Sequence, residues 1–281
     1  MSTEAPVLRR APGPWLHYGV VPAPSVRAKF YAELRSTAQE LLAADEGAAD
    51  FFFLHKPPGL RVRFRVPGPE RAGVDRLLRE RLTRWRSDGL LLDWTGGVYE
   101  PEEYLFGGPV SLRSVHRIFT ADSLAWLGFH QSGLGSRAAW AMSLVMVRDL
   151  LDALDIVGWE DLDVWDRLRR QTGRRYADGA EPPEEAERIA EALRAGWADP
   201  GTLARRLPAG AVEYAEEFRR AVVAAGERWR GDYFTVGDPA VGPREAAAFV
   251  IVFHWNRAGL SLVRQTLIAE ALTVRPGGGV K

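Results

Sequence analysis

The sequence predicts an α+β protein in which an N-terminal ferredoxin-like βαββαβ unit is followed by a mostly helical half. Strand-like and helix-like stretches occur in the order β-α-β-β-α-β over residues 15–100, which is the order of the split βαβ unit. Over residues 110–272, apolar residues recur at helical spacing instead. The chain has 281 residues, and we expect residues 1–281 to form one domain that ends in a flexible tail at 273–281.

Two periodicities separate the elements of the first part. Successive side chains of a strand point to opposite faces, so a half-buried strand alternates apolar and polar residues. Helices instead repeat apolar residues three and four positions apart. The expected elements are a strand at 15–21, a helix at 24–44, strands at 49–54 and 60–66, a helix at 70–86 and a strand at 90–99.

The second part is expected to contain helices. The segment 136–154 is apolar nearly all round, so we expect it to be buried. The segment 242–272 is expected to form one long closing helix. The expected helices span 111–128, 136–154, 161–174, 184–198, 211–230 and 242–272.

Composition excludes several kinds of site and partner. The chain has no cysteine, so disulfides, thiolate metal ligands and a cysteine nucleophile are excluded. Its 5 histidines lack the spacing of a metal site, so we expect no metal. Its 37 basic residues balance 37 acidic ones, which argues against a nucleic-acid partner. Because no apolar run could span a bilayer and no signal peptide is recognisable, we expect a cytoplasmic protein without a membrane partner.

A row of arginines distinguishes one of the expected strands. In the strand at 60–66, which follows a Pro57-Pro58-Gly59 turn, apolar residues alternate with Arg61, Arg63 and Arg65. The period of two places these guanidinium groups on one face of the sheet. They are either solvated or directed at an anionic or carbonyl-rich ligand.

A polar stripe interrupts the apolar closing helix. His254, Arg257, Ser261 and Gln265 fall near one side of it at helical spacing. Buried polar groups need partners, because each unpaired one costs about 1–3 kcal/mol. The stripe therefore either belongs to a functional site or forms a hydrogen-bonded structural network.

A cluster of arginines lies at the end of the segment 161–174 and just beyond it. It either docks an acidic peptide or forms a solvated helix face that balances the acidic residues at 184–187. Its members are Arg167, Arg169, Arg170, Arg174 and Arg175.

Several short motifs together resemble one family. In order and spacing, from about Trp15 to Leu272, they are similar to the stand-alone thiopeptide-type bacteriocin biosynthesis proteins, which are related to the elimination domain of class I lantibiotic dehydratases. The resemblance implies a lantibiotic dehydratase elimination-domain-like fold and a single catalytic domain. The motifs are Arg61-Val62-Arg63-Phe64, Tyr99-Glu100-Pro101-Glu102 with Gly107-Gly108, Asp122-Ser123, and Asn256-Arg257.

The chain departs from the eliminating members of that family. They carry an arginine where this chain has Leu105 and a histidine where it has Val252. They also carry Arg-Tyr in place of His55-Lys56 and a histidine in place of Gly59. The resemblance implies that the arginine and histidine positions serve elimination of glutamate from a glutamylated Ser or Thr. A leucine and a valine can neither bind a carboxylate nor transfer a proton.

The resemblance therefore favours another branch of the family, the pyridine synthases of thiopeptide biosynthesis. They join two dehydroalanines of a precursor peptide in a formal aza-[4+2] cycloaddition, and then aromatise the ring by losing water and the leader peptide. This chemistry needs no cofactor. The implied partner is a ribosomally made precursor peptide, with a leader and a core bearing azoles and dehydroalanines; other enzymes of the pathway are further candidates. The alternatives are a glutamate-eliminating dehydratase subunit and a non-catalytic scaffold that binds the precursor.

One pocket is expected to collect the functional side chains. An arginine row, a Tyr-Glu-rich turn and a polar stripe in an apolar helix are each explained if one cavity uses them all. We expect proton transfer by His254, Tyr99 and Glu102. Substrate contacts are expected from Arg61, Arg63, Tyr104, Ser123, Asn256 and Arg257, and leader contacts from Arg167, Arg169, Arg170, Arg174 and Arg175.

Overall fold

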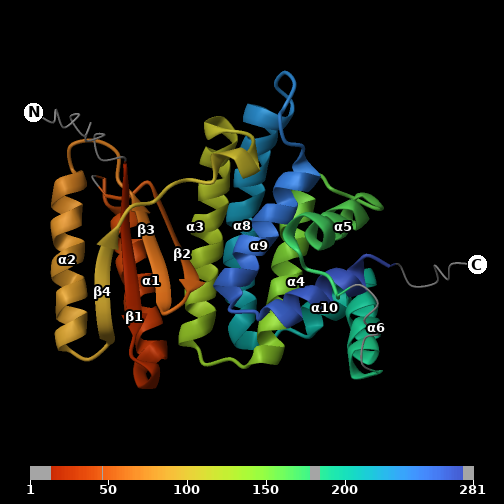
Figure 1. Cartoon of the computed structure of the whole chain (residues 1–281), viewed down its shortest axis with the longest axis horizontal. Helices are drawn as coiled ribbons and strands as arrows, with labels where there is room; N and C mark the ends of the chain where they lie inside the picture. The colour runs from red at the N-terminus through yellow and green to blue at the C-terminus, as the bar shows by residue number, and fades with distance from the viewer. Residues whose placement is uncertain (1–13, 46, 178–183, 275–281) are drawn as a thin grey trace, which may run out of the picture.

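The computed structural model describes residues 14–45, 47–177 and 184–274. A small sheet with two helices stands on one side of the molecule, and a group of further helices forms the other side (Figure 1). The sheet part contains β1 (Trp15–Pro22), α1 (Arg27–Ala43), β2 (Asp50–Lys56), β3 (Gly59–Arg65), α2 (Arg71–Ser87) and β4 (Leu91–Gly97), with a short 3-10 turn at Pro24–Val26.

The predicted βαββαβ unit is confirmed. Its strands lie in the order β2-β3-β1-β4, and every neighbouring pair is antiparallel. This order is that of two split βαβ units. Helix α1 connects β1 to β2, with β3 between them, and α2 connects β3 to β4, with β1 between them. The sheet is therefore built as the alternation pattern indicated.

The two faces of the sheet have different surroundings. Tyr18, Val62 and Phe64 lie on one face, where the side chains of α1 and α2 cover them. Arg63 lies on the opposite face, because it stands directly across from His17 on β1 and Phe52 on β2. We call this second side, with Arg61, Arg63 and Arg65, the arginine face.

Helix α3 (Pro109–Gln131) covers the outer edge of β2. The backbone N–H of Phe51 donates a hydrogen bond to Thr120 Oγ1 at 3.0 Å, and that of Phe53 donates to Ser123 Oγ at 3.2 Å. An open strand edge would leave these donors available to other chains. The two hydroxyl groups therefore satisfy the edge and join the sheet to the helical half.

The helical half matches the prediction except for one additional short helix, α7 (Pro200–Arg205), and for its end. The expected single helix at 242–272 is wrong, because α9 (Pro243–Ala258) ends at Gly259, which has a φ of 70°. A new helix begins after Ser261, whose Oγ accepts the N–H of Arg264. The helices are α3, α4 (Ser136–Ala153), α5 (Glu160–Thr172), α6 (Glu184–Ala198), α7 (Pro200–Arg205), α8 (Ala209–Trp229), α9 and α10 (Leu262–Leu272), with short turns η2 (Glu103–Phe106) and η3 (Arg230–Phe234).

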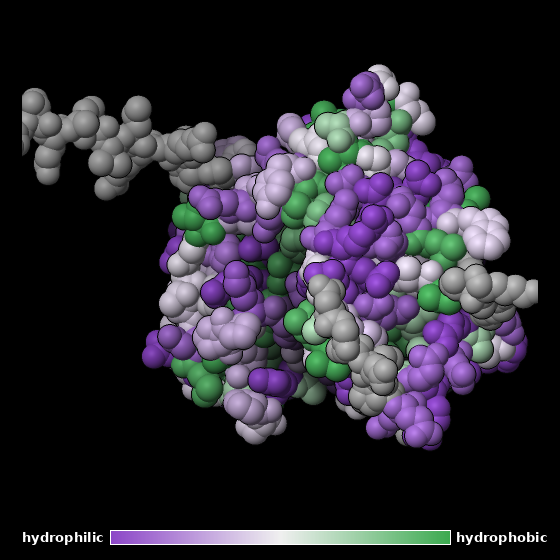
Figure 2. Space-filling view, turned by 45° about the vertical axis from the view of Figure 1, so that its right-hand side comes forward, coloured by the Kyte–Doolittle hydropathy of each residue, from purple (hydrophilic) through white to green (hydrophobic). Residues whose placement is uncertain are grey.

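Two further features complete the description. Figure 2 shows a band of apolar side chains running vertically through the middle of one face of the molecule. None of the helices described in the structure is long and apolar enough to cross a membrane. Most of the expected flexible tail at 273–281 lies outside the described residues.

Ser123→Ala tests the bond between α3 and the sheet. It leaves the N–H of Phe53 buried without a partner, so the free energy of unfolding should fall by about 1–3 kcal/mol in denaturant titrations. The matched control is Ser87→Ala, since Ser87 bonds a carbonyl at an exposed position and should change stability little. Equal losses in the two variants would contradict the assigned role.

Candidate active site

Arg63 occupies the centre of the arginine face. Its Cζ lies 4.9 Å from the ring centroid of Phe52 and 4.2 Å from that of Tyr99, so the guanidinium group rests on two aromatic rings. Its Nε donates to Nδ1 of His17 at 3.4 Å. Arg63 is only 8% exposed, and its Nη1 has no hydrogen-bond partner among the described residues. A buried donor without a protein partner is available for water or a ligand.

The two neighbouring arginines differ in their pairing. Arg65 Nε lies 2.5 Å from Oδ2 of Asp50, which commits that guanidinium to an ion pair. Arg61 reaches across Gly19 on β1, where a β-carbon would lie 2.5 Å from Arg61 Nη1. No ion pair to Arg61 is present in the described part of the chain. Glycine at position 19 thus leaves room for a second available cation beside Arg63.

Tyr99 joins the arginine face to α3. Its hydroxyl lies 3.1 Å from Nε2 of His116 and 3.4 Å from Oε2 of Glu102. When His116 donates through Nε2, the Tyr99 hydroxyl is free to donate to the Glu102 carboxylate. These three groups then form a continuous chain for a proton.

The protonation states of this chain follow from its burial. Burial lowers the pKa of His116 to about 3, with Arg65 and Arg63 adding to the effect, so its imidazole is neutral at neutral pH. Burial and the Glu102 carboxylate raise the pKa of Tyr99, so its hydroxyl keeps its proton. The site therefore holds a neutral imidazole and a neutral phenol beside a carboxylate and a cation, a set of groups through which a proton can be transferred.

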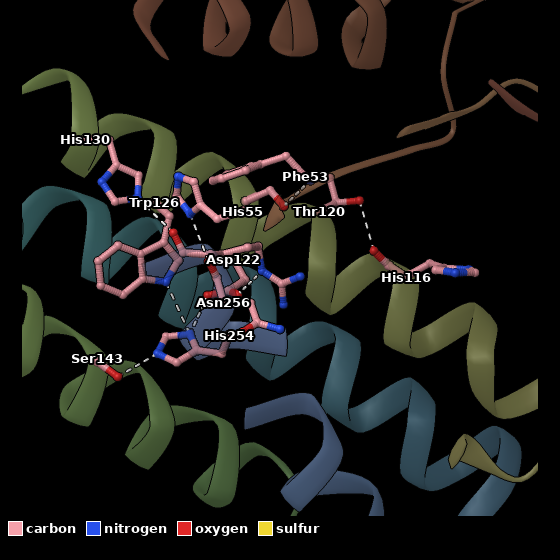
Figure 3. Close-up of polar contacts among 12 residues, drawn as sticks. Phe53, His55, His116, Thr120, Asp122, Trp126, His130, Ser143, His254 and Asn256 are labelled. Atoms are coloured by element: carbon pink, nitrogen blue, oxygen red, sulfur yellow. Dashed lines mark hydrogen bonds and ion pairs between the residues drawn. The ribbon is translucent and has the colours of Figure 1, made fainter. Parts of the chain in front are cut away.

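A second group of polar side chains lies inside the helical half, where α3, α4 and α9 meet (Figure 3). Asp122 Oδ1 lies 2.7 Å from Nδ1 of His254, and Ser143 Oγ lies 2.9 Å from Nε2 of the same ring. Trp126 Nε1 also approaches Nδ1, at 3.3 Å. The shorter contact indicates that Nδ1 carries its hydrogen toward Asp122.

The order serine, histidine, aspartate resembles a hydrolytic triad, but its burial excludes that use here. Ser143, His254 and Asp122 are at most 3% exposed, so no substrate reaches the serine hydroxyl in this arrangement. The second carboxylate oxygen of Asp122 instead binds Nε of Arg257. Burial raises the pKa of Asp122, but His254 and Arg257 hold it below its ordinary value, so it remains ionised. The network holds the guanidinium group of Arg257 in place.

Arg257 is completely buried and only partly paired. Its Cζ lies 4.4 Å above the ring centroid of Phe119, while Nη1 and Nη2 have no hydrogen-bond partner among the described residues. Phe119 and Phe52 have centroids 5.4 Å apart, and Arg63 rests on Phe52. Burial lowers the pKa of Arg63; Tyr99 and Glu102 oppose this effect, whereas the charges of Arg61 and Arg257 add to it. The guanidinium groups are thus close enough to repel one another, and an oxygen ligand among them would relieve this repulsion.

Two histidines fix the end of α9 beside Arg257. His55 Nδ1 lies 2.9 Å from the carbonyl oxygen of Asn256, and His130 Nε2 lies 2.8 Å from that of Arg257. Tyr31 bonds the other nitrogen of His55 at 2.8 Å. Burial lowers the pKa of both His55 and His130, that of His130 to about 4. Both imidazole rings are therefore neutral and donate to the last turn of the helix.

The structure brings together only part of the expected pocket. Tyr99, Glu102, Arg61 and Arg63 lie together at the arginine face, and Arg257 lies behind its aromatic layer. Tyr104 is 79% exposed on η2 and makes no contact with this group in the described structure.

Two expected site residues are buried in structural contacts. Ser123 uses its hydroxyl to bond the edge of β2, and His254 is enclosed by α3 and α4. His254 was expected to line an open pocket with Arg61; its burial corrects that expectation, because both ring nitrogens already have partners on other helices. The half-buried Asn256 contributes its backbone carbonyl to His55.

The arginines at 167–175 are largely neutralised within the fold. Arg167 pairs with Asp163 and Glu245, and Arg169 pairs with Asp166 and Glu270. The remaining contacts join Arg170 to Asp166 and Arg174 to Gln265, while Arg175 is exposed and also has a partner. This pairing leaves less free positive charge for an acidic peptide than the sequence suggested.

Sequence reasoning missed His116, His17 and Ser143. His116, Phe119, Thr120 and Ser123 follow one another at helical spacing and therefore share one face of α3, the face that meets β2. This spacing could have indicated that His116 lies near Ser123, which was an expected site residue. His17 alternates with the apolar residues of β1 and stands across from Arg63. Ser143 lies in a helix that is apolar nearly all round, and no motif in the adjacent sequence indicates that its hydroxyl has a polar partner.

Comparison with known proteins identifies the family. The family model for the C-terminal part of the lantibiotic biosynthesis dehydratases matches residues 15–274. The chain belongs to this family, which confirms the expected resemblance. A search of curated protein sequences found no match.

Solved structures are similar to this chain at low sequence identity. The tRNA-dependent lantibiotic dehydratase MibB from Microbispora sp. 107891 is 21% identical with a TM-score of 0.65; the match covers 96% of this chain but only 28% of MibB. TsrL is 17% identical with a TM-score of 0.52, covering 92% of this chain and 93% of that one. TbtD, a pyridine synthase from thiomuracin biosynthesis, is 18% identical with a TM-score of 0.49, covering 92% and 97%.

The neutral histidines predict acid sensitivity. The pKa values of His17, His116 and His130 in the fold, about 4, about 3 and about 4, lie below the ordinary 6.5, so the unfolded chain binds more protons as the pH falls. Their contribution is complete above about pH 6.5 and is lost toward pH 4, at about 1.4 kcal/mol per pH unit for each histidine.

Denaturant titrations of the parent and of His116→Phe, at a series of pH values, check this expectation. The parent should lose stability steadily between about pH 6 and 4.5, and the variant should show a shallower slope by about 1.4 kcal/mol per pH unit. Parallel curves for the two proteins would show that His116 is not neutral in the fold.

Proposed function

We propose that this protein is a thiopeptide pyridine synthase, which converts a precursor peptide bearing two dehydroalanines into a macrocycle with a central pyridine. The proposal goes beyond family membership, since the family comprises lantibiotic biosynthesis proteins in general. It rests on the resemblance of the motifs and on the chemistry of the side chains at the site. The glutamate-eliminating dehydratase subunit remains the competing function.

The apolar contact between η2 and α9 is the observation that carries the proposal. Leu105 and Val252, which replace the arginine and histidine of the eliminating members, are partly buried against the hydrophobic core. Phe106, which follows Leu105, lies 6.4 Å from Phe249 and 6.1 Å from Phe253, measured between ring centroids. An interface filled by these side chains offers no group to bind a glutamyl carboxylate or to transfer a proton.

The groups that remain suit a reaction on amide carbonyls. In the proposed reaction, one dehydroalanine reacts as its imidic-acid tautomer, so a proton leaves the amide nitrogen and another reaches the carbonyl oxygen. The Glu102–Tyr99–His116 chain can accept and return a proton, which contributes about 10²–10⁴ in rate. Arg61 and Arg63 stabilise negative charge that develops on the oxygen.

The proposed reaction balances without an oxidant or reductant. Two carbon–carbon bonds form between the azadiene and the second dehydroalanine, which gives a six-membered ring. Loss of the hydroxyl group as water, and of the leader as its carboxamide, then makes the ring aromatic. Holding two distant alkenes in contact contributes up to about 7–11 kcal/mol, so positioning is the largest expected contribution of the protein.

Activity on defined peptides tests the proposal. A peptide with two dehydroalanines and an intact leader should give a macrocycle and a free leader carboxamide by mass spectrometry, without transfer RNA. Arg63→Lys loses the planar guanidinium and its contact with two rings, so kcat should fall by about tenfold or more. Arg65→Lys is the control, because that arginine is committed to Asp50. Release of glutamate from a glutamylated peptide, with no macrocycle formed, would establish the eliminase instead.

A positioning role for His254 and Asp122 follows from the buried network. Asp122→Asn removes the charge that holds Arg257, so kcat should fall by about tenfold while KM changes little, with stability lower by about 3–5 kcal/mol. The kinetics are measured where circular dichroism shows the variant folded. Ser143→Ala, at the far end of the network, serves as the comparison and should keep most of kcat. Loss of kcat only in proportion to the unfolded fraction would leave Asp122 with a purely structural role.

A further inference from the structure

His17 lies on the arginine face between two neighbouring strands. It stands across from Arg63 on β3 and from Gly97 on β4, so its imidazole ring lies beside both positions. The His17 ring is half-buried, whereas Thr95 and Gly97 on β4 are exposed and Arg63 is buried. His17 therefore stands where the buried centre of the arginine face meets its open edge.

The two nitrogens of the His17 ring have different surroundings. Nδ1 accepts a hydrogen bond from Nε of Arg63 at 3.4 Å. Burial, and then the cations of β3 and of Lys56, lower the pKa of His17 to about 4, so the ring is neutral at neutral pH. In a neutral imidazole the nitrogen that accepts carries no hydrogen, so the ring hydrogen is on Nε2. The contact with Arg63 thus selects one tautomer and leaves an N–H donor at the other side of the ring.

Glycine at position 97 makes room for this donor. A β-carbon there would lie 3.4 Å from Cδ2 and 3.7 Å from Nε2 of His17, so this edge of the ring lies over the backbone of β4. No hydrogen bond to Nε2 is present among the described residues. Gly19, two positions further along β1, leaves similar room for Nη1 of Arg61. The two glycines therefore leave the N–H groups of His17 and Arg61 available on the same face of the sheet.

The available nitrogens on this face call for a ligand that accepts hydrogen bonds. The guanidinium groups of Arg61 and Arg63 can only donate, and so can Nε2 of the neutral His17 ring. A third cation at this place would add to the repulsion between the two arginines, whereas a neutral imidazole supplies an N–H without a charge. An amide carbonyl oxygen has two lone pairs, so it can accept from more than one of these donors.

We propose that His17 is a substrate-binding residue that donates its Nε2 hydrogen to the carbonyl oxygen of the reacting amide. This role rests on the proposed function and adds a neutral donor to the guanidinium groups of the arginine face. The carbonyl oxygen gains negative charge while the amide nitrogen loses its proton, so a donor at this oxygen stabilises the species that leads to the azadiene. The other ring nitrogen keeps the imidazole oriented through Arg63.

Two variants separate the roles of the two nitrogens. Glutamine places an N–H near the position of Nε2 but loses the acceptor at Nδ1, whereas asparagine places an acceptor near Nδ1 but loses the donor at Nε2. His17→Gln should therefore keep kcat within about threefold of the parent, and His17→Asn should lower kcat by about tenfold or more. Circular dichroism melts show at which temperature both variants are folded and can be compared.

The opposite order would overturn the proposal, because activity retained by His17→Asn and lost by His17→Gln would assign His17 to the positioning of Arg63 alone. Equal values of kcat in the two variants, whether lowered or unchanged, would overturn it as well. The comparison is matched, since each variant keeps one half of the hydrogen-bonding capacity of the ring.

A modified substrate identifies the acceptor atom. A thioamide sulfur at the reacting carbonyl accepts hydrogen bonds more weakly than oxygen, so it should cost the parent more in kcat than it costs His17→Asn, which has no donor at Nε2. The two changes should then combine to less than the product of their separate effects. Independent effects would show that His17 does not donate to this atom.

Nitrogen NMR of isotopically labelled histidine tests the contact without turnover. The ligand is the leader-bearing peptide with alanine in place of the second dehydroalanine, which keeps the reacting amide and cannot cyclise. Its binding should shift the signal of Nε2, which should carry the hydrogen at neutral pH. A shift on binding, in a protein that forms no macrocycle from the complete substrate, would retain the His17 contact and reject the pyridine synthase. A macrocycle formed at the parent rate by His17→Asn would do the reverse.

Discussion

The carboxylate of Asp122 connects the parts of this structure on which the candidate site depends. One oxygen binds His254 and the other binds Arg257, so a single side chain of α3 accepts bonds from two positions of α9 that lie about one turn apart. All three side chains are buried, where removal of one member of an ion pair leaves the other charge uncompensated. The orientation of Arg257 therefore depends on the relative position of two helices, and the same α3 bonds the edge of the sheet through Ser123.

Two parts of the candidate site have different structural origins. The arginine face is set by strand register, because Arg63 stands across from His17 and Phe52. The contact of η2 with α9 contains Leu105 and Val252, two of the residues on which the proposed function rests. The fold alone does not determine the function, which has to be argued from the particular side chains of the site.

The sheet could be predicted from sequence because its signals are local. Alternation of Leu60, Val62 and Phe64 with arginines fixes both the strand and its faces, and the turn at Pro57-Pro58 fixes the hairpin. The helical half gave less information. Apolar periodicity continues on both sides of Gly259, so the break between α9 and α10 was not recognised. A helix surrounded by other helices has no exposed face, and its sequence does not show which polar residues find partners. The pairing of His254 with Ser143 and Asp122 joins residues more than a hundred positions apart, which periodicity does not reveal.

The coverage of β2 by α3 leaves β4 as the open edge of the described sheet. An unpaired edge can recruit strands from other molecules, and proteins reduce that risk with charged residues, short strands and irregular backbone. β4 has these properties: Asp93 is exposed along it, Gly96 and Gly97 end it, and the side chain of Arg79 lies over Gly96. Its pairing with β1 shifts register beside Pro22. The sheet is therefore a poor template for intermolecular β-pairing, and β4 should not recruit strands from other copies of the chain.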